Sequence, residues 1–157
     1  MAFGGLSLAL ASAVPAQPMP PLPAHALILF GAHWCAPCTA ELRDLDSMLA
    51  RLALLALLAQ APDQTGRQQI ALAWIDRPLS GATVTRVLER KSVENRPLVV
   101  LPPPALAAAW AEPLMASAHG LPFAAMTDAR GKVCALHQGV LRAADIADLS
   151  AACHRAN

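Results

Sequence analysis

Two cysteines separated by two residues are the part of the sequence best able to do chemistry. They lie in the run Trp34-Cys35-Ala36-Pro37-Cys38, between an apolar stretch and a long run of helix-forming residues. A thiol at the start of a helix meets unpaired backbone N–H groups and the positive end of the helix dipole, which favour the reactive thiolate. The spacing therefore predicts that Cys35 is a nucleophile and that Cys38, one turn further on, resolves a mixed disulfide.

Two other interpretations of this pair stay open. It supplies half of a zinc site, and His33 or His119 could complete a copper or zinc site, although structural zinc sites usually have four ligands. The second interpretation is a purely structural disulfide, although the short loop that Cys35 and Cys38 would close adds little stability. Because Cys134 and Cys153 are not spaced as a second pair of zinc ligands, we expect no metal and no cofactor apart from the redox-active disulfide.

The residues around the motif predict alternating strands and helices. Continuous apolar runs over 26–32 and 70–75 are typical of buried parallel strands. A helix is expected from residue 37 to about residue 60, since apolar side chains recur there every three or four positions. The elements that follow are a helix over 83–91, a short strand over 98–101, a helix over 105–118 interrupted near Pro113, a hairpin over 123–137 and a helix over 142–153. This order indicates a layered α/β fold.

The run LILFGAHWCAPC, followed by a long helix, resembles the thioredoxin superfamily and in particular its exported TlpA/ResA-like branch. The resemblance covers residues 25–153. It implies a single thioredoxin-like α/β domain, in which a central mixed β-sheet is flanked by helices. It also implies that the Cys35–Cys38 dithiol or disulfide exchanges with substrate proteins, with Trp34, Ala36 and Pro37 in the vicinity of the active site.

Three further stretches carry the resemblance. Gly120-Leu121-Pro122 is similar to the family's cis-proline loop, which implies that Leu121 and Pro122 lie beside the cysteines and bind the substrate backbone. The run over 127–133 is similar to a hairpin of the family. Glu41, three residues after the second cysteine, matches a glutamate next to the active site of this branch, which implies a part in proton transfer. A surface charge that suits the helix dipole is the alternative for this residue.

The chain departs from the family pattern at three positions. Leu29 stands where thioredoxins have a buried aspartate, so the usual proton acceptor is missing and Glu41 or water must replace it. Arg43 stands where this branch usually has a proline. Phe123 follows the predicted cis-proline, where members that mature cytochromes usually have an acidic residue, and this argues against a role in cytochrome c assembly.

The other two cysteines lie where a second disulfide is feasible. Eleven steps along a helix cover about 16 Å and five steps along a strand cover about 17 Å. The helix over 142–153 therefore returns to the level at which the strand over 132–137 began. A Cys134–Cys153 disulfide would contribute about 3 kcal/mol in an oxidising compartment. Two buried free thiols are the alternative.

The first 24 residues differ from the rest of the chain. The apolar run over 6–14 is too short to span a bilayer and suits the core of a secretory signal, although no Lys or Arg precedes Arg43. We therefore divide the chain into a signal-like, proline-rich segment over 1–24 and a thioredoxin-like domain over 25–157. Export to the periplasm is the expected localisation, and a disordered tail is the alternative.

The charge balance limits the partners that the chain can have. Twelve basic and eleven acidic side chains give a formal net charge of +1, so no strong field attracts nucleic acid or an anionic membrane. We expect a monomer that acts on substrate proteins with disulfides or thiols. Ala36-Pro37 lacks the histidine of strongly oxidising relatives, which favours a reductant recharged by a membrane thiol reductase. A non-catalytic module that binds a partner around Pro122 is the alternative function.

Overall fold

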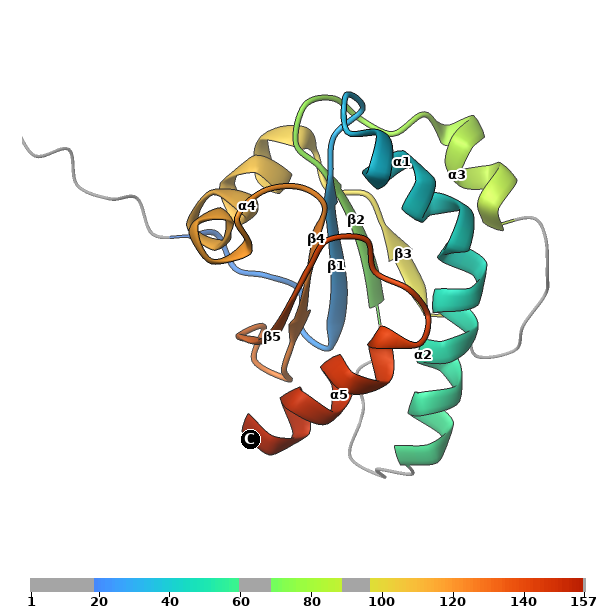
Figure 1. Cartoon of the computed structure of the whole chain (residues 1–157), viewed down its shortest axis with the longest axis vertical. Helices are drawn as coiled ribbons and strands as arrows, with labels where there is room; N and C mark the ends of the chain where they lie inside the picture. The colour runs from blue at the N-terminus through green and yellow to red at the C-terminus, as the bar shows by residue number, and fades with distance from the viewer. Residues whose placement is uncertain (1–18, 60–68, 89–96, 157) are drawn as a thin grey trace, which may run out of the picture.

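A mixed five-stranded sheet lies at the centre of the molecule, and helices cover both of its faces (Figure 1). The computed structural model describes residues 19–59, 69–88 and 97–156. Its strands are β1 Ala26–Gly31, β2 Gln69–Trp74, β3 Leu98–Val100, β4 Phe123–Thr127 and β5 Val133–Gln138. They lie side by side in the order β3-β2-β1-β4-β5, which confirms the predicted fold class.

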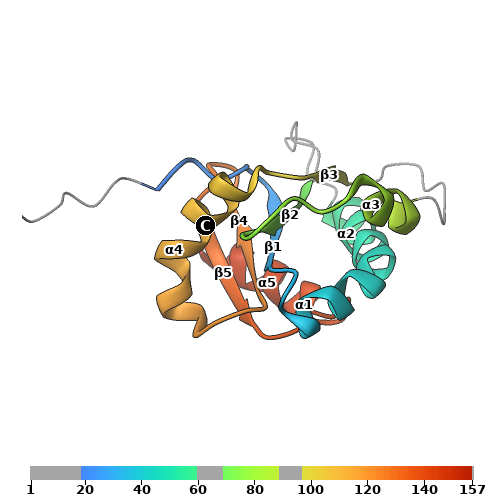
Figure 2. The same ribbon diagram turned by 90° about the horizontal axis from the view of Figure 1, so that it is seen from above.

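The helices form two layers. They are α1 Ala36–Glu41, α2 Leu45–Ala59, α3 Gly81–Leu88, α4 Pro104–Ala118 and α5 Asp145–Ala156, with a 3-10 turn, η1, at Leu42–Asp44. Seen from above, α4 lies on one face of the sheet, and α1, α2 and α5 lie on the other (Figure 2). The helix predicted over 83–91 corresponds to α3, and residues 89–91 lie outside the described residues. Within the described ranges, no helix is both long enough and apolar enough to cross a membrane.

β1 occupies the middle of the sheet and is buried along its whole length. It pairs in parallel with β2 and in antiparallel with β4. Leu27 and Leu29 belong to the core on the α2 side, whereas Ile28 and Phe30 belong to the core on the α4 side, because successive side chains of a strand alternate. Both faces are covered, which is why the strand is a continuous apolar run.

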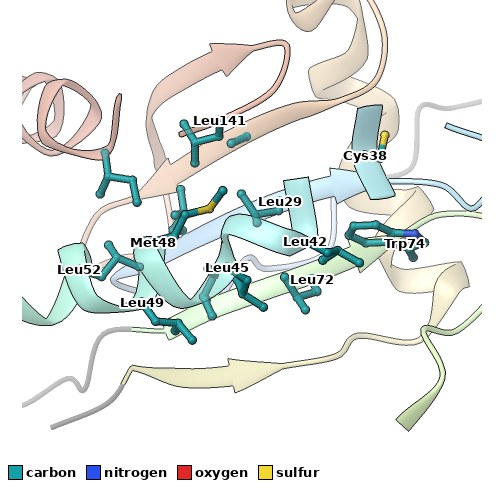
Figure 3. Packing of buried hydrophobic residues seen from close by; sticks show 14 of the residues in the cluster. Leu29, Cys38, Leu42, Leu45, Met48, Leu49, Leu52, Leu72, Trp74 and Leu141 are labelled. Atoms are coloured by element: carbon teal, nitrogen blue, oxygen red, sulfur yellow. The ribbon is translucent and has the colours of Figure 1, made fainter. Parts of the chain in front are cut away.

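α2 turns a row of large apolar side chains toward the sheet (Figure 3). These side chains are almost fully buried and belong to one cluster with Leu29 and Leu72 of the central strands; they are Leu45, Met48, Leu49 and Leu52. The three- and four-residue spacing of these side chains predicted this face. Packing on the sheet holds α2 in place, and with it the shorter α1 that precedes it.

On the opposite face, α4 covers an aromatic cluster. Phe30 and Phe123 are register partners on β1 and β4, and their ring centroids lie 4.4 Å apart. Trp110 of α4 belongs to the same cluster. The predicted interruption near Pro113 is wrong, since α4 continues through this residue. Pro113 is exposed and its missing N–H removes one helical hydrogen bond, while the buried side of the helix stays packed.

The single helix predicted over 37–60 is divided by η1. The chain contains no Gly or Pro at this point that could have signalled a break. The 3-10 turn follows directly after Glu41, whose buried carboxylate accepts the backbone N–H of Leu141. Helix propensity did not predict the division, because it contains no information about tertiary contacts.

The stretch just before β1 also packs on the domain. Leu22 is buried in the core on the α4 side. Thr127 Oγ donates to the Pro23 carbonyl at 2.6 Å and accepts the first N–H of β1 at 2.9 Å. Gly131 of the β4–β5 turn has a φ of +73°, and a Cβ there would collide with the Leu22 carbonyl. Part of the predicted N-terminal segment therefore packs on the domain, and residues 1–18 lie outside the described residues.

A disulfide joins the last strand to the last helix. Cys134 of β5 and Cys153 of α5 are bonded, with their Cα atoms 4.8 Å apart, which is the pairing that the lengths of strand and helix allowed. Ile146 and Leu149 of α5 lie in the α2-side core. The helix is therefore held by apolar packing along its length and by a covalent bond near its C-terminus.

Replacing both cysteines of this disulfide by serine, Cys134→Ser and Cys153→Ser, should lower the free energy of unfolding by about 3 kcal/mol. The unfolded chain then regains the entropy that closing the loop had removed. Urea denaturation of the oxidised variant and parent measures the change. The control is Cys35→Ser with Cys38→Ser, which opens a loop of sequence separation 3 instead of 19 and should cost less. Equal stability of the Cys134/Cys153 variant and the parent would contradict a stabilising crosslink.

Candidate active site

The two cysteines of the motif lie at the junction between β1 and α1. Figure 1 shows β1 leading into α1 at one end of the sheet. Cys35 and Cys38 are joined by a disulfide, with their Cα atoms 5.3 Å apart. Cys35 is the N-cap residue of α1, with a φ of −89° and a ψ of 98°, and Pro37 lies in the first turn. A proline is tolerated there because its missing N–H would have had no helical partner. The predicted strand-to-helix junction is confirmed.

The Cys35 sulfur caps the helix. The backbone N–H of Cys38 donates to Sγ of Cys35 at 3.2 Å, a place that a serine or aspartate oxygen commonly takes at a helix start. In the reduced protein, the same N–H can donate to a thiolate. A charged acceptor makes the stronger hydrogen bond, so this geometry favours the ionised sulfur.

Solvent exposure differs sharply along the motif. Trp34 is 71% exposed, Cys35 is 5% exposed and Cys38 is completely buried. Ala36 and Pro37 between the cysteines are exposed. Of the two cysteines, only Cys35 keeps any contact with solvent.

Gly31, the last residue of β1, gives the motif the room that it needs. A Cβ at this position would lie 2.9 Å from the ring of Trp74 and 3.1 Å from the Cβ of Cys38. Trp74 is almost fully buried, so its ring cannot swing into solvent. A larger residue at position 31 would push either the ring or α1 out of place.

Glu41 is buried next to the motif. It and Cys38 are the two buried residues of α1, three positions apart and so on one side of the helix. The backbone N–H of Leu141 donates to Oε1 at 2.5 Å, and Oε2 has no hydrogen-bond partner among the described residues. Burial raises the pKa of Glu41 to about 7, against the opposing effect of the Leu141 hydrogen bond. This carboxyl can therefore gain or lose a proton near neutral pH.

The three departures from the family pattern have structural consequences. Leu29 is fully buried in the α2-side core, so no carboxyl lies at that position, and Glu41 is the buried acidic residue of the described ranges. Phe123 stacks on Phe30, in an apolar environment where a charge would be costly. Arg43 lies exposed on η1.

The predicted proline loop lies at the same end of the sheet as the motif. The Leu121–Pro122 peptide bond is cis, as the resemblance implies. The buried Pro122 accepts the N–H of Gly139 through its carbonyl, at 2.9 Å. Leu121 packs against the cluster that contains both cysteines of the motif. Because Phe123 pairs with Phe30 near the end of β1, the loop and the motif are brought together by the sheet.

The two histidines that could have completed a metal site lie in different settings. His33 Nδ1 lies 3.1 Å from the carboxylate of Asp76, whereas His119 is exposed at the C-cap of α4 with a φ of 54°. In the part of the chain that the structure describes, no three His, Cys, Asp or Glu side chains are grouped as metal ligands. The sequence did not indicate Asp76 or the N–H of Leu141 as part of the site. An aspartate in a turn and a backbone N–H group have no sequence pattern that would distinguish them.

The pH dependence of stability tests the Glu41 carboxyl. Its pKa in the folded protein is about 7 against an ordinary value of 4.5, so the folded state holds this proton more tightly than the unfolded state. The resulting stabilisation is complete below pH 4.5 and is lost as the pH rises through 7. The free energy of unfolding should therefore fall by as much as about 3 kcal/mol across this range.

The Glu41→Gln variant keeps an oxygen for Leu141 but cannot titrate, so subtracting its profile removes the contribution of the histidines. Urea denaturation of both proteins at several pH values between 4.5 and 8 gives the comparison. Parallel profiles for the parent and Glu41→Gln would contradict the raised pKa.

The chain is similar to several solved structures. No family model and no curated protein matches the chain. Among solved structures it is similar to a protein described as the thiol:disulfide interchange protein DsbE of Chlorobium tepidum, with 21% identity, a TM-score of 0.47 and coverage of 83% of this chain and 78% of that chain. StoA of Bacillus subtilis has 16% identity, a TM-score of 0.41 and coverage of 80% and 81%.

The exposed lipoprotein thioredoxin Etrx1 of Streptococcus pneumoniae strain TIGR4 has 21% identity, a TM-score of 0.39 and coverage of 80% and 83%. Identities this low do not transfer an activity. The sheet order, the two helical layers and the cysteine pair at the end of β1 nevertheless agree with the arrangement that the sequence resemblance implies. The chain has a thioredoxin-like fold.

Proposed function

We propose that this protein is a thiol–disulfide oxidoreductase that works through Cys35 and Cys38. The observation that carries the proposal is a disulfide at the start of a helix, in which Cys35 keeps 5% of its surface exposed beside the exposed Trp34 and Cys38 has none. Exchange with a protein substrate needs one sulfur that the substrate can reach and one that acts only inside the molecule. The N–H of Cys38, bonded to the first sulfur, supports its thiolate form.

The reaction is a pair of sulfur displacements. The Cys35 thiolate attacks a substrate disulfide, which forms a mixed disulfide and releases one substrate thiolate. The Cys38 thiol then loses its proton and attacks the Cys35 sulfur, which forms the Cys35–Cys38 disulfide and releases the second substrate thiolate. The substrate gains two electrons and is released as two thiolates, which take up the proton lost by Cys38 and one proton from the solvent, and the protein is left oxidised.

Glu41 is placed to take part in the second displacement. It lies three residues after Cys38 on the same buried side of α1, and its pKa of about 7 lets it accept a proton near neutral pH. Its Oε2, which has no partner among the described residues, is the atom available for that proton. Leu29 offers no alternative carboxyl, so Glu41 is our candidate for the group that deprotonates the resolving thiol.

Substrate proteins would be held by the surface around the first sulfur. Trp34 is exposed there, and Leu121 and Pro122 lie in the cis-proline loop at the same end of the sheet. We expect Trp34, Ala36 and Pro37, together with the loop at Leu121 and Pro122, to contact the substrate backbone. A chain that only binds partners would use the same surface, so activity must be tested separately from binding.

Single cysteine variants make that test. Cys35→Ser should abolish turnover in a disulfide reductase assay, because the remaining thiol, Cys38, is completely buried and does not meet the substrate. Cys38→Ser should stop after the first displacement and accumulate a mixed disulfide, seen as a mass increase that dithiothreitol reverses. In the same assay Glu41→Gln should slow resolution of the mixed disulfide while leaving its formation unchanged. A protein that turns over no disulfide substrate, or that keeps its partner equally well in both cysteine variants, would be a binding module.

We further propose that the protein acts as a reductant outside the cytoplasm. The apolar run over 6–14 and a second disulfide, which persists in oxidising compartments, support export. An exported reductant needs electrons from across the membrane, which a membrane thiol reductase would supply. N-terminal sequencing of the mature protein tests the export, and the monomeric state stays a prediction.

The reduction potential decides the direction of electron flow. We expect the Cys35–Cys38 couple to lie below about −200 mV, nearer to thioredoxin than to the strongly oxidising periplasmic enzymes. Equilibration with glutathione buffers, followed by mass analysis of the alkylated thiols, gives the value. The Cys134→Ser/Cys153→Ser variant serves as the control, since only the motif can then contribute. A potential near −120 mV would make the protein an oxidant instead.

A further inference from the structure

His33 and Asp76 join the ends of two neighbouring strands beside the cysteine motif. The backbone N–H of His33 donates to both carboxylate oxygens of Asp76, at 3.2 and 3.1 Å. The ring Nδ1 of His33 lies 3.1 Å from one of these oxygens. One carboxylate therefore binds the main chain and the side chain of the same residue.

This contact continues the register of β1 and β2 beyond their last paired residues. Gly31 is the register partner of Trp74, and the N–H of Ile75 donates to the Gly31 carbonyl at 3.0 Å. Two residues further along each chain, His33 stands opposite Asp76 with the same separation of 43 positions. The side-chain carboxylate thus serves as the acceptor where the backbone ladder has ended.

The Asp76 carboxylate is ionised at neutral pH. Desolvation acts against ionisation, but hydrogen bonds from the side chain and backbone of His33 and from the backbone of Arg77 hold the pKa of Asp76 below its usual range. An ionised carboxylate can only accept, so the ring nitrogen that faces it must carry the proton. The contact therefore selects the Nδ1–H form of His33 and fixes the orientation of the ring.

His33 lies in the tight turn that carries the first cysteine. The N–H of Cys35 donates to the Ala32 carbonyl at 3.1 Å, which closes the turn over His33 and Trp34. Tying His33 to the end of β2 therefore restrains the turn. The conformation of this turn directs the Cys35 sulfur toward the Cys38 N–H.

We propose that His33 and Asp76 are a positioning pair that holds the turn before α1, so that the Cys35 sulfur keeps the Cys38 N–H as its donor. This role rests on the proposed function, since it concerns the reactivity of the same sulfur. Neither residue has to touch a substrate. The negative charge of Asp76 by itself would disfavour a nearby thiolate, so position and charge act in opposite directions.

Two substitutions of Asp76 separate position from charge. Asp76→Ala removes the charge and both acceptors, whereas Asp76→Asn removes the charge but keeps one oxygen for the His33 N–H. In the reduced full chain, Asp76→Ala should slow alkylation of Cys35 by iodoacetamide at pH 7 about threefold to tenfold, the equivalent of one hydrogen bond. Asp76→Asn should react within about twofold of the parent, or faster. Mass mapping of the modified peptide identifies Cys35.

Asp128→Ala is the matched control. Asp128 also accepts two backbone N–H groups, from Arg130 and Lys132, but it lies in the β4–β5 turn at the far end of the sheet. Its replacement should leave the alkylation of Cys35 unchanged. The positioning role would be overturned if Cys35 were alkylated as fast in the Asp76→Ala variant as in the parent. It would also be overturned if alkylation in the Asp76→Asn variant were as slow as in the Asp76→Ala variant.

A second measurement needs no substitution. In the parent, the amide resonance of His33 should follow the titration of Asp76, with a midpoint below the usual range for an aspartate. An amide shift that stays constant while Asp76 titrates would overturn the pair, even if Asp76→Ala does not fold. Alkylation and amide shifts need no substrate. A missing reductase activity would therefore count against the proposed function only. The alkylation rates and the amide shift would still test the role of His33 and Asp76.

Discussion

The hydrogen bond from the Cys38 N–H to the Cys35 sulfur depends on where β1 stops. This strand has both faces buried, so it cannot slip by one residue without turning every side chain to the wrong core. Its last residue, Gly31, lets the ring of Trp74 and the start of α1 approach each other. The reactive sulfur is thus placed by a strand that has no polar side chain of its own.

Two carboxyl groups near the motif have pKa values displaced in opposite directions. Burial raises the pKa of Glu41 to about 7, whereas the hydrogen bonds from His33 keep the pKa of Asp76 below its usual range in spite of partial desolvation. Asp76 therefore stays charged and serves as a fixed acceptor, while Glu41 can exchange a proton. Environment alone makes this difference between two ordinary acids.

The C-terminal part of the chain completes the site from a distance. Leu141, which precedes α5, donates its N–H to Glu41, and Ile146 of α5 packs into the core that contains both cysteines of the motif. The disulfide between Cys134 and Cys153 holds the far end of the same helix. The setting of the buried carboxyl therefore depends on the packing and crosslinking of a helix that begins about a hundred residues later in the chain.

The strands and helix starts that depend on neighbouring residues could be predicted from the sequence. The apolar run before the motif predicts β1, and Pro37 with the two cysteines predicts the helix start, because strand burial and helix entry depend on neighbouring residues. The buried Glu41 finds its backbone donor, Leu141, 100 positions away, and Asp76 meets His33 because β1 and β2 end level with each other. The sequence by itself determined which groups can react. The tertiary structure alone decided which of them are sealed, paired or able to titrate, because desolvation and hydrogen bonding come from partners that no local pattern encodes.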